Sequence, residues 1–171
     1  LPAGLVHRGS HEFLATEDQA ITSNAATDLV QRAMTSSEPL YVVAIGAVTN
    51  IASALLLEPR LVEKIVVVWL GGQAHHAPTA HEFNLSQDVY ASRLLFDCGV
   101  PLVQIPCQGV ASHLLSTVAE LERFVQGRGA IGDYLVEIFK AYHNDHFAWS
   151  KVIWDIAATA YLINPAWVPT Q

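Results

Sequence analysis

The sequence is poor in cysteine, which narrows the class of protein it can belong to. It has only two, Cys98 and Cys107, each beside apolar neighbours and neither in a C-x-x-C spacing. We expect reduced, partly buried thiols in a cytoplasmic protein rather than a disulfide framework. No chemistry is assigned to either thiol.

Basic residues are also scarce. Nine lysines and arginines stand against 16 acidic residues, and the formal net charge is -7. The basic residues are scattered along the chain, so it lacks the clustered positive surface that binds phosphate backbones. We therefore predict no nucleic-acid partner.

Long hydrophobic segments are the third absence. Apolar runs such as Ile65 to Leu70 are far shorter than the roughly 20 residues that a membrane-spanning helix needs. The chain does not open with a basic segment followed by an apolar stretch, as a signal peptide would. These features predict a soluble, unexported, cytoplasmic protein without a membrane partner.

The sequence does contain enough apolar material for a core. It has 171 residues, 51% of them hydrophobic, which predicts a single domain over residues 1–171. Three short apolar runs, at residues 40–45, 65–70 and 101–105, indicate buried strands. Apolar residues at helical spacing, bounded by helix-breaking residues, predict helices at residues 22–36, 49–57, 87–97, 118–125, 131–142 and 155–163. Ser23 is a candidate cap for the first of these helices. This alternation predicts an α/β fold with a mostly parallel sheet.

Ligands of open parallel sheets bind beyond the carboxyl ends of the strands. In this sequence that rule selects three loops, at residues 46–50, 71–87 and 106–113. The first loop contains Thr49, and the second contains Glu82 and Asn84.

Asp155 is the only charged residue between Val152 and Ile163. A carboxylate buried among apolar neighbours would cost several kcal/mol without a partner, so we expect one. Asp155 either caps the helix that follows it or binds a metal ion or a sugar hydroxyl, and the two roles are compatible.

Glu82 and Asn84 flank Phe83 in the second loop. In an extended loop the two polar side chains would point the same way while Phe83 turns inward. Alternatively, Asn84 caps the next helix, with Gln87 completing a capping box. In the first loop, Thr49 is either an ordinary helix cap or a residue whose backbone carbonyl meets a ligand.

Six of the eight histidines lie between residues 75 and 146. His143 and His146 have the i, i+3 spacing that lets two side chains share a helix face. Without cysteine or a third ligand at zinc spacing, a dedicated zinc site is disfavoured. A catalytic acid is the more plausible role for one of the six histidines considered, His75, His76, His81, His113, His143 and His146.

Three blocks of sequence, taken in order, resemble the inosine-uridine nucleoside hydrolase family. They are AIGAVTNIASALLLEPRLVEKIVVVWLGG, HEFNLSQDVYASRLLFDCGVPL and WDIAATAYLINP. The resemblance implies a doubly wound α/β fold, a bound Ca²⁺ ion, usually a homo-oligomer, and hydrolysis of the N-glycosidic bond of a ribonucleoside substrate.

Carried over residue by residue, the resemblance implies calcium ligation by the backbone carbonyl of Thr49 and the carboxylate of Asp155. Asn84 would hold a ribose hydroxyl near the metal, and Glu82 would contact the 5′-hydroxyl. Oxygen ligands suit this hard cation. Trp154 stands where pyrimidine-accepting relatives have a histidine acid and purine-preferring relatives a stacking tryptophan, so it predicts a purine ribonucleoside. An aromatic core role is the alternative for Trp154.

The sequence also departs from the family pattern. The family's amino-terminal motif D-x-D-x-x-x-D-D, which supplies most calcium ligands and the catalytic base, does not occur. We expect the chain to be the central to carboxy-terminal portion of a nucleoside hydrolase, with the general base upstream and no catalytic residue of its own. Alone it should be inactive and bind Ca²⁺ poorly. The alternatives are a non-catalytic nucleoside-binding, sugar-binding or interaction module, and a missing strand supplied by another chain.

A smaller departure concerns the loop before the Glu-Phe-Asn triplet, where family members often have an asparagine. Gln73, His75 and His76 are the residues available there in this sequence.

Overall fold

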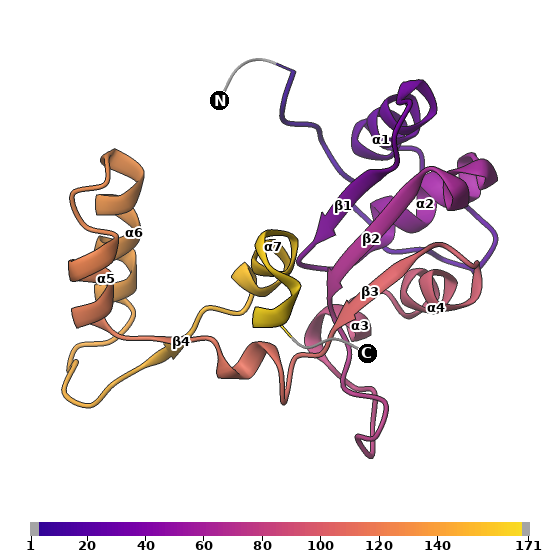
Figure 1. The fold of residues 1–171 in the computed structure, drawn as a ribbon. Helices are drawn as coiled ribbons and strands as arrows, with labels where there is room; N and C mark the ends of the chain where they lie inside the picture. Colours follow the sequence, from indigo (N-terminus) through magenta and orange to yellow (C-terminus); the bar gives the residue numbers. More distant parts are fainter. Residues whose placement is uncertain (1–3, 169–171) are drawn as a thin grey trace.

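The computed structural model describes residues 4–168, and its centre is a three-stranded parallel sheet. The strands are β1 (Leu40–Ala44), β2 (Ile65–Leu70) and β3 (Leu102–Ile105), in the order β1-β2-β3 (Figure 1). Leu40 lies opposite Ile65 and Val67 opposite Leu102. The α/β class and the parallel sheet predicted from the sequence are confirmed.

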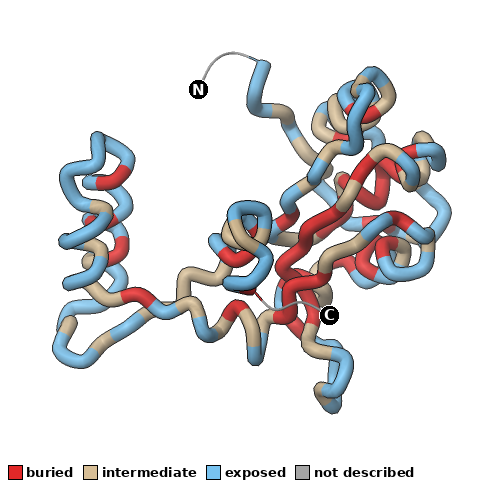
Figure 2. Tube along the Cα trace, viewed as in Figure 1, coloured by how far each residue is buried: buried red, intermediate tan, exposed pale blue. Residues whose placement is uncertain are grey.

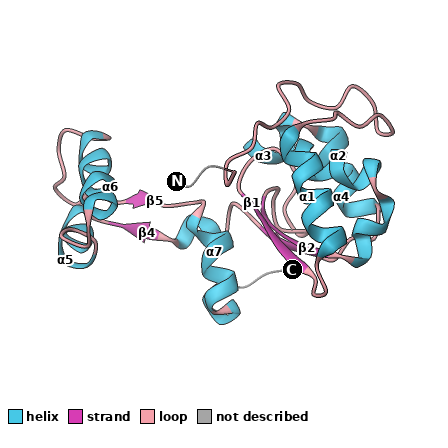
Figure 3. Ribbon diagram, turned by 90° about the horizontal axis from the view of Figure 1, so that it is seen from above, coloured by secondary structure: helices cyan, strands magenta, loops and turns pink. Residues whose placement is uncertain are grey.

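Helices cover both faces of this sheet, as in a doubly wound fold. On one face lie α1 (Asn24–Thr35), α2 (Thr49–Leu57) and α4 (Val89–Asp97), and on the other lies α7 (Ile156–Ile163) (Figures 1 and 3). The Ser23 hydroxyl accepts a hydrogen bond from the Ala26 N–H, so the predicted cap of α1 is confirmed.

Each covered face has its own hydrophobic core. The larger core joins β1 and β2 to α1, α2 and α4, and its central residues include Val67 and Trp69. The smaller one joins Val68 and Ile105 of the sheet to α7 through Ala157 and Ala158. Figure 2 shows β2 as an almost continuous buried trace, because both cores meet on this strand.

The prediction that residues 40–45 form a strand buried on both faces is wrong for β1. Tyr41 is 60% exposed and Val43 39% exposed, whereas Ala44 is buried. Tyr41 and Val43 stay accessible because the core on the α7 side contains residues of β2 and β3, such as Val68 and Ile105, and no described residue of β1. Among residues 4–168, β1 pairs only with β2.

Two glycines after β2 turn the chain into the loop before α3 (Phe83–Gln87). β2 ends at Leu70 and is followed by two glycines. A Cβ atom at Gly71 would clash with the Trp69 indole, and Gly72 adopts a positive φ of 70°. The remaining short elements are the 3-10 helices η1 (Pro59–Glu63), η2 (Ala111–His113) and η3 (Pro165–Trp167).

A helical hairpin stands apart from the sheet in both Figure 1 and Figure 3. It consists of α5 (Val118–Phe124) and α6 (Ala130–Ala141), connected to the rest by the antiparallel pair β4 (Leu115–Ser116) and β5 (Lys151–Val152). The single domain over residues 1–171 stays a prediction. Within the described residues, none of the helices is both long enough and apolar enough to cross a membrane.

Candidate functional site

A cavity of about 390 Å³ opens where β1 and β2 end. Its wall contains Ile45, which follows β1, and Leu70, the last residue of β2. Four residues singled out in the sequence also line it, namely Glu82, Asn84, Trp154 and Asp155. Segments about 70 residues apart in the sequence therefore meet at the carboxyl edge of the sheet, as the rule for parallel sheets predicts.

Glu82 anchors the start of α3. Its carboxylate accepts hydrogen bonds from the backbone N–H groups of Gly72 (2.9 Å), Asn84 (3.0 Å) and Leu85 (3.0 Å). The cap of this helix is thus Glu82, and the alternative in which Asn84 caps with Gln87 is wrong. Three of the roughly four acceptor positions of the carboxylate are already used.

Phe83 does not turn inward as expected, because it is 77% exposed while Glu82 and Asn84 are buried. Phe83 is the first residue of α3, and it lines the same cavity as Glu82 and Asn84. The Asn84 amide donates from Nδ2 to the Leu70 carbonyl at 2.9 Å, which ties α3 to the end of β2. Its Oδ1 atom remains available as an acceptor.

Asp155 lies on the open side of the cavity. It is exposed, and its side chain makes no capping hydrogen bond to α7. Asp155 occupies the N-terminal cap position of α7 without a side-chain hydrogen bond, so the expectations of a buried carboxylate and of a capping side chain are wrong. The metal or sugar-hydroxyl partner stays a prediction. Trp154 is half-buried and packs against the smaller core while lining the cavity.

Thr49 lies apart from the cavity lining, in the first turn of α2. Val48 occupies the cap position and Thr49 does not, so the cap alternative for Thr49 is wrong. The buried Thr49 hydroxyl donates to Asp88 Oδ2 at 2.6 Å. Asp88 also accepts from the N–H groups of Leu14 (3.0 Å) and Ala91 (2.9 Å).

Cys107 and Gln108 line the cavity but were not candidates from the sequence. They belong to the loop at residues 106–113, which the strand-end rule had selected and which contains no acidic or basic residue other than His113. Burial raises the pKa of the Cys107 thiol, and the nearby Glu82 carboxylate raises it further. Cys107 therefore presents a neutral thiol at physiological pH.

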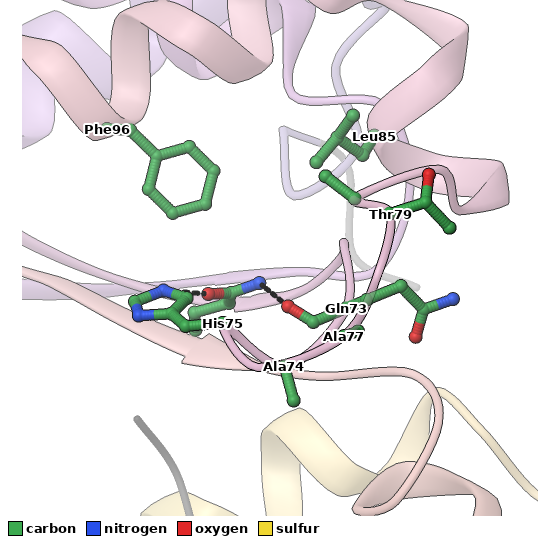
Figure 4. A pocket seen from close by; sticks show the side chains of 9 residues that line it. Gln73, Ala74, His75, Ala77, Thr79, Leu85 and Phe96 are labelled. Atoms are coloured by element: carbon green, nitrogen blue, oxygen red, sulfur yellow. Dashed lines mark hydrogen bonds between the residues drawn. The ribbon is translucent and has the colours of Figure 1, made fainter.

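The three residues available in place of the family's loop asparagine lie elsewhere. Gln73 and His75 line a second cavity of about 290 Å³, shown in Figure 4. There the buried Gln104 amide donates to the carbonyls of Gly71 (3.0 Å) and Gln73 (3.1 Å), and its Oε1 atom lies 3.1 Å from His75 Nε2. His76 is exposed and lines neither cavity.

His143 and His146 do not share a helix face, because α6 ends at Ala141. Both rings pack against Trp149, at centroid distances of 5.5 and 5.7 Å. No histidine of residues 4–168 lines the cavity that holds Asp155. The prediction of a catalytic acid among the histidines thus gains no support from that cavity.

Calcium takes six to eight oxygen ligands. The Asp155 carboxylate and Asn84 Oδ1 are hard oxygen donors without a partner in the described part of the chain. The Glu82 carboxylate is largely occupied by backbone N–H groups. Residues 4–168 contain no cluster of three or more His, Cys, Asp or Glu suited to a metal ion. The described residues therefore offer part of an oxygen shell and do not complete one.

The chain matches the sequence profile of the family described as "Inosine-uridine preferring nucleoside hydrolase" over residues 3–171. It belongs to this family. A curated relative, the pyrimidine-specific ribonucleoside hydrolase RihB of Escherichia coli, is 28% identical over 161 residues, which are 90% of this chain and 51% of the relative.

Solved structures share the fold. A plant nucleoside hydrolase superposes with a TM-score of 0.70 at 23% identity, covering 86% of this chain and 49% of that one. A purine-preferring ribonucleoside hydrolase from Gardnerella vaginalis gives a TM-score of 0.68 at 24% identity, with 86% and 49% covered. The chain thus spans about half the length of these relatives.

Proposed function

We propose that this chain is part of a calcium-dependent ribonucleoside hydrolase that cleaves the N-glycosidic bond to give ribose and a free base. Membership of the family supports this proposal. The observation that carries it is the convergence of Glu82, Asn84, Trp154 and Asp155 on one cavity at the carboxyl edge of the sheet.

The cavity offers hydrogen-bond acceptors to a polyol. Asn84 Oδ1 and the Asp155 carboxylate accept only, whereas ribose hydroxyls can donate. In this proposal they hold the sugar hydroxyls, and Glu82 uses its remaining acceptor position for the 5′-hydroxyl. A sugar fixed in this way presents C1′ in one orientation, which lowers the entropic cost of attack.

Calcium would be held by the Asp155 carboxylate and the Thr49 carbonyl. When bound, the ion would polarise the sugar hydroxyls and lower the pKa of a bound water. The geometry supports Asp155 more directly than Thr49, because only Asp155 lines the cavity. The general base that deprotonates the water is proposed to come from outside these 171 residues. The chain alone should therefore not hydrolyse a nucleoside.

The leaving base would stack on Trp154, which favours a purine ribonucleoside. The relatives differ in this respect, since the Escherichia coli enzyme is named pyrimidine-specific and the Gardnerella vaginalis enzyme purine-preferring. The half-buried position of Trp154 in the cavity wall supports a stacking role. Assembly as a homo-oligomer and location in the cytoplasm stay predictions.

Release of ribose from inosine and uridine tests the proposal. It should be measured for the 171-residue chain and for the chain together with whatever its natural gene encodes ahead of Leu1. We expect release only in the second case, with loss on chelation of calcium. Asp155→Asn should reduce release more than tenfold, because losing even a group that only orients a metal ligand typically costs about 10- to 100-fold. Asp97→Asn, an exposed aspartate at the end of α4, is the control.

Three outcomes would contradict parts of this proposal. Ribose release by the 171-residue chain would show that its own residues supply the base. Release that is insensitive to calcium chelation would exclude the metal. Nucleoside binding without release, in every form of the protein, would favour the alternative of a non-catalytic binding module.

A further inference from the structure

The loop that follows β3 contributes one further polar side chain to the cavity, that of Gln108. We propose that the side-chain carboxamide of Gln108 recognises the hydrogen-bonding edge of the nucleobase. This inference rests on the proposed function, because it takes the cavity with Asp155 and Asn84 to be a nucleoside site. It adds a specificity-determining residue on the side of the base.

The carboxylate and amide groups of Glu82, Asn84 and Asp155 leave only acceptor atoms free in the cavity. Glu82 is largely occupied by three backbone N–H groups, and Asn84 has committed its Nδ2 donor to Leu70. What remains free on Asn84 and Asp155 is acceptor oxygen. These acceptors suit sugar hydroxyls and leave the acceptor atoms of a base without a donor.

The Gln108 side chain supplies a hydrogen-bond donor beside an acceptor. Its side chain is exposed, lines the cavity and has no hydrogen-bond partner among residues 4–168. A carboxamide has a donor beside an acceptor, which matches the carbonyl beside an N–H that hypoxanthine and uracil present. The Trp154 indole can only donate and the neutral Cys107 thiol is a weak donor, so neither provides this pair.

Hydrogen bonds hold the backbone at Gln108 in place. The Gln108 N–H donates to Gln73 Oε1 at 3.1 Å, and the Cys107 N–H donates to the Gly72 carbonyl at 3.0 Å. The Cys107 carbonyl accepts from the Ser112 N–H at 2.9 Å. These bonds tie the loop to the segment that Glu82 also holds. Because the backbone is already held, binding has to order only the Gln108 side chain and not the loop, which favours recognition.

A pair of ligands isolates this hydrogen-bond contact. Inosine has the carbonyl and N–H pair on its base, whereas purine riboside has the same ring system and sugar without it. Stacking and ribose contacts are common to both ligands. The difference between them therefore reports the recognition of the edge.

Binding of both ligands to the purified protein should be measured by ligand-observed NMR titration, for the wild type and for Gln108→Met, which is close in size and apolar. We expect Gln108→Met to weaken inosine about three- to tenfold and purine riboside less than about twofold, the range for one neutral hydrogen bond. Gln126→Met, at an exposed glutamine between α5 and α6, should change neither affinity.

The outcomes separate the two proposals. Equal weakening of both ligands by Gln108→Met, or no weakening, would overturn the role of Gln108 while leaving the nucleoside site intact. Failure of the wild type to bind inosine, purine riboside and the base-free sugar analogue 1,4-anhydroribitol would overturn both. Binding of 1,4-anhydroribitol but of neither nucleoside would support the sugar site and overturn the proposal for Gln108.

Discussion

The Thr49 hydroxyl donates a 2.6 Å hydrogen bond to the buried carboxylate of Asp88, which joins the first turn of α2 to the start of α4. The same carboxylate accepts the Leu14 and Ala91 N–H groups. One side chain thus holds α2, α4 and the amino-terminal segment together.

Replacing Asp88 by alanine should therefore destabilise the fold strongly. The change leaves three buried donors without an acceptor. We expect a loss of about 3 kcal/mol in the free energy of unfolding, measured by urea denaturation. Asp97→Ala at the other end of α4 removes only an exposed ion pair with Arg93 and should cost less than about 0.5 kcal/mol. Similar losses in both variants would contradict the role given to Asp88.

Glu82→Gln tests whether the carboxylate is as much a helix anchor as a ligand contact. Glutamine has one acceptor oxygen and would place an NH₂ group against backbone N–H groups that Glu82 now satisfies. The unfolding free energy should fall by about 2 kcal/mol. Glu137→Gln, on the exposed surface of α6, is the matched control and should be nearly neutral. An unchanged stability in Glu82→Gln would leave only a ligand role.

Trp154→Leu tests the proposed stacking of the base. Loss of the indole should weaken inosine about fivefold and uridine less, because the larger purine ring has more stacking area to lose. Nucleoside titrations give the ratio of affinities, and thermal unfolding checks the packing against the smaller core. Trp167→Leu, at an exposed tryptophan that ends η3, serves as the control. Equal weakening of both nucleosides would indicate a packing role instead.

The pH dependence of stability should contain a contribution from Glu58. Hydrogen bonds from the Arg60 side chain and backbone, followed by its positive charge, lower the pKa of Glu58 from 4.5 to about 2. A carboxyl group with a lowered pKa in the folded state stabilises the fold above its unfolded pKa. This stabilisation should be complete above pH 4.5 and disappear as the pH falls toward about 2.

The measurement is the difference in urea midpoint between the wild type and Glu58→Gln, at pH 7 and at successively lower pH. The difference should be largest at pH 7 and shrink below pH 4.5. Arg60→Met should remove most of the same difference, because Arg60 causes the lowered pKa. A difference that does not change with pH would assign the effect of Glu58→Gln to packing.

The central part of the fold was predictable because its signals are local. β2 coincides with the predicted strand at residues 65–70, since a run rich in β-branched residues ends at glycine and is buried on both faces. β1 has a similar composition, but its burial depends on what covers the sheet there. Tyr41 and Val43 remain exposed, and their sequence carries no sign of this.

The site was predictable to the extent that the resemblance supplied it. The four residues carried over for substrate contact all line one cavity, whereas Thr49 does not. Asp155 was misjudged because apolar neighbours do not guarantee burial, and Ile156 and Ile163 of α7 are themselves exposed. Gln108 was missed because a glutamine in a loop is common. Its proposed role follows only from the hydrogen bonds that the neighbouring groups already make, and the sequence does not show these.

The open edge of β1 also affects how the protein behaves at high concentration. Leu40–Ala44 contains no charge, proline or glycine, and its outer backbone groups are unpaired among residues 4–168. Such an edge is a template for strands of other molecules, so it invites aggregation. A lysine placed there by Val43→Lys, on an exposed position, should act as a gatekeeper and raise the concentration at which the protein precipitates.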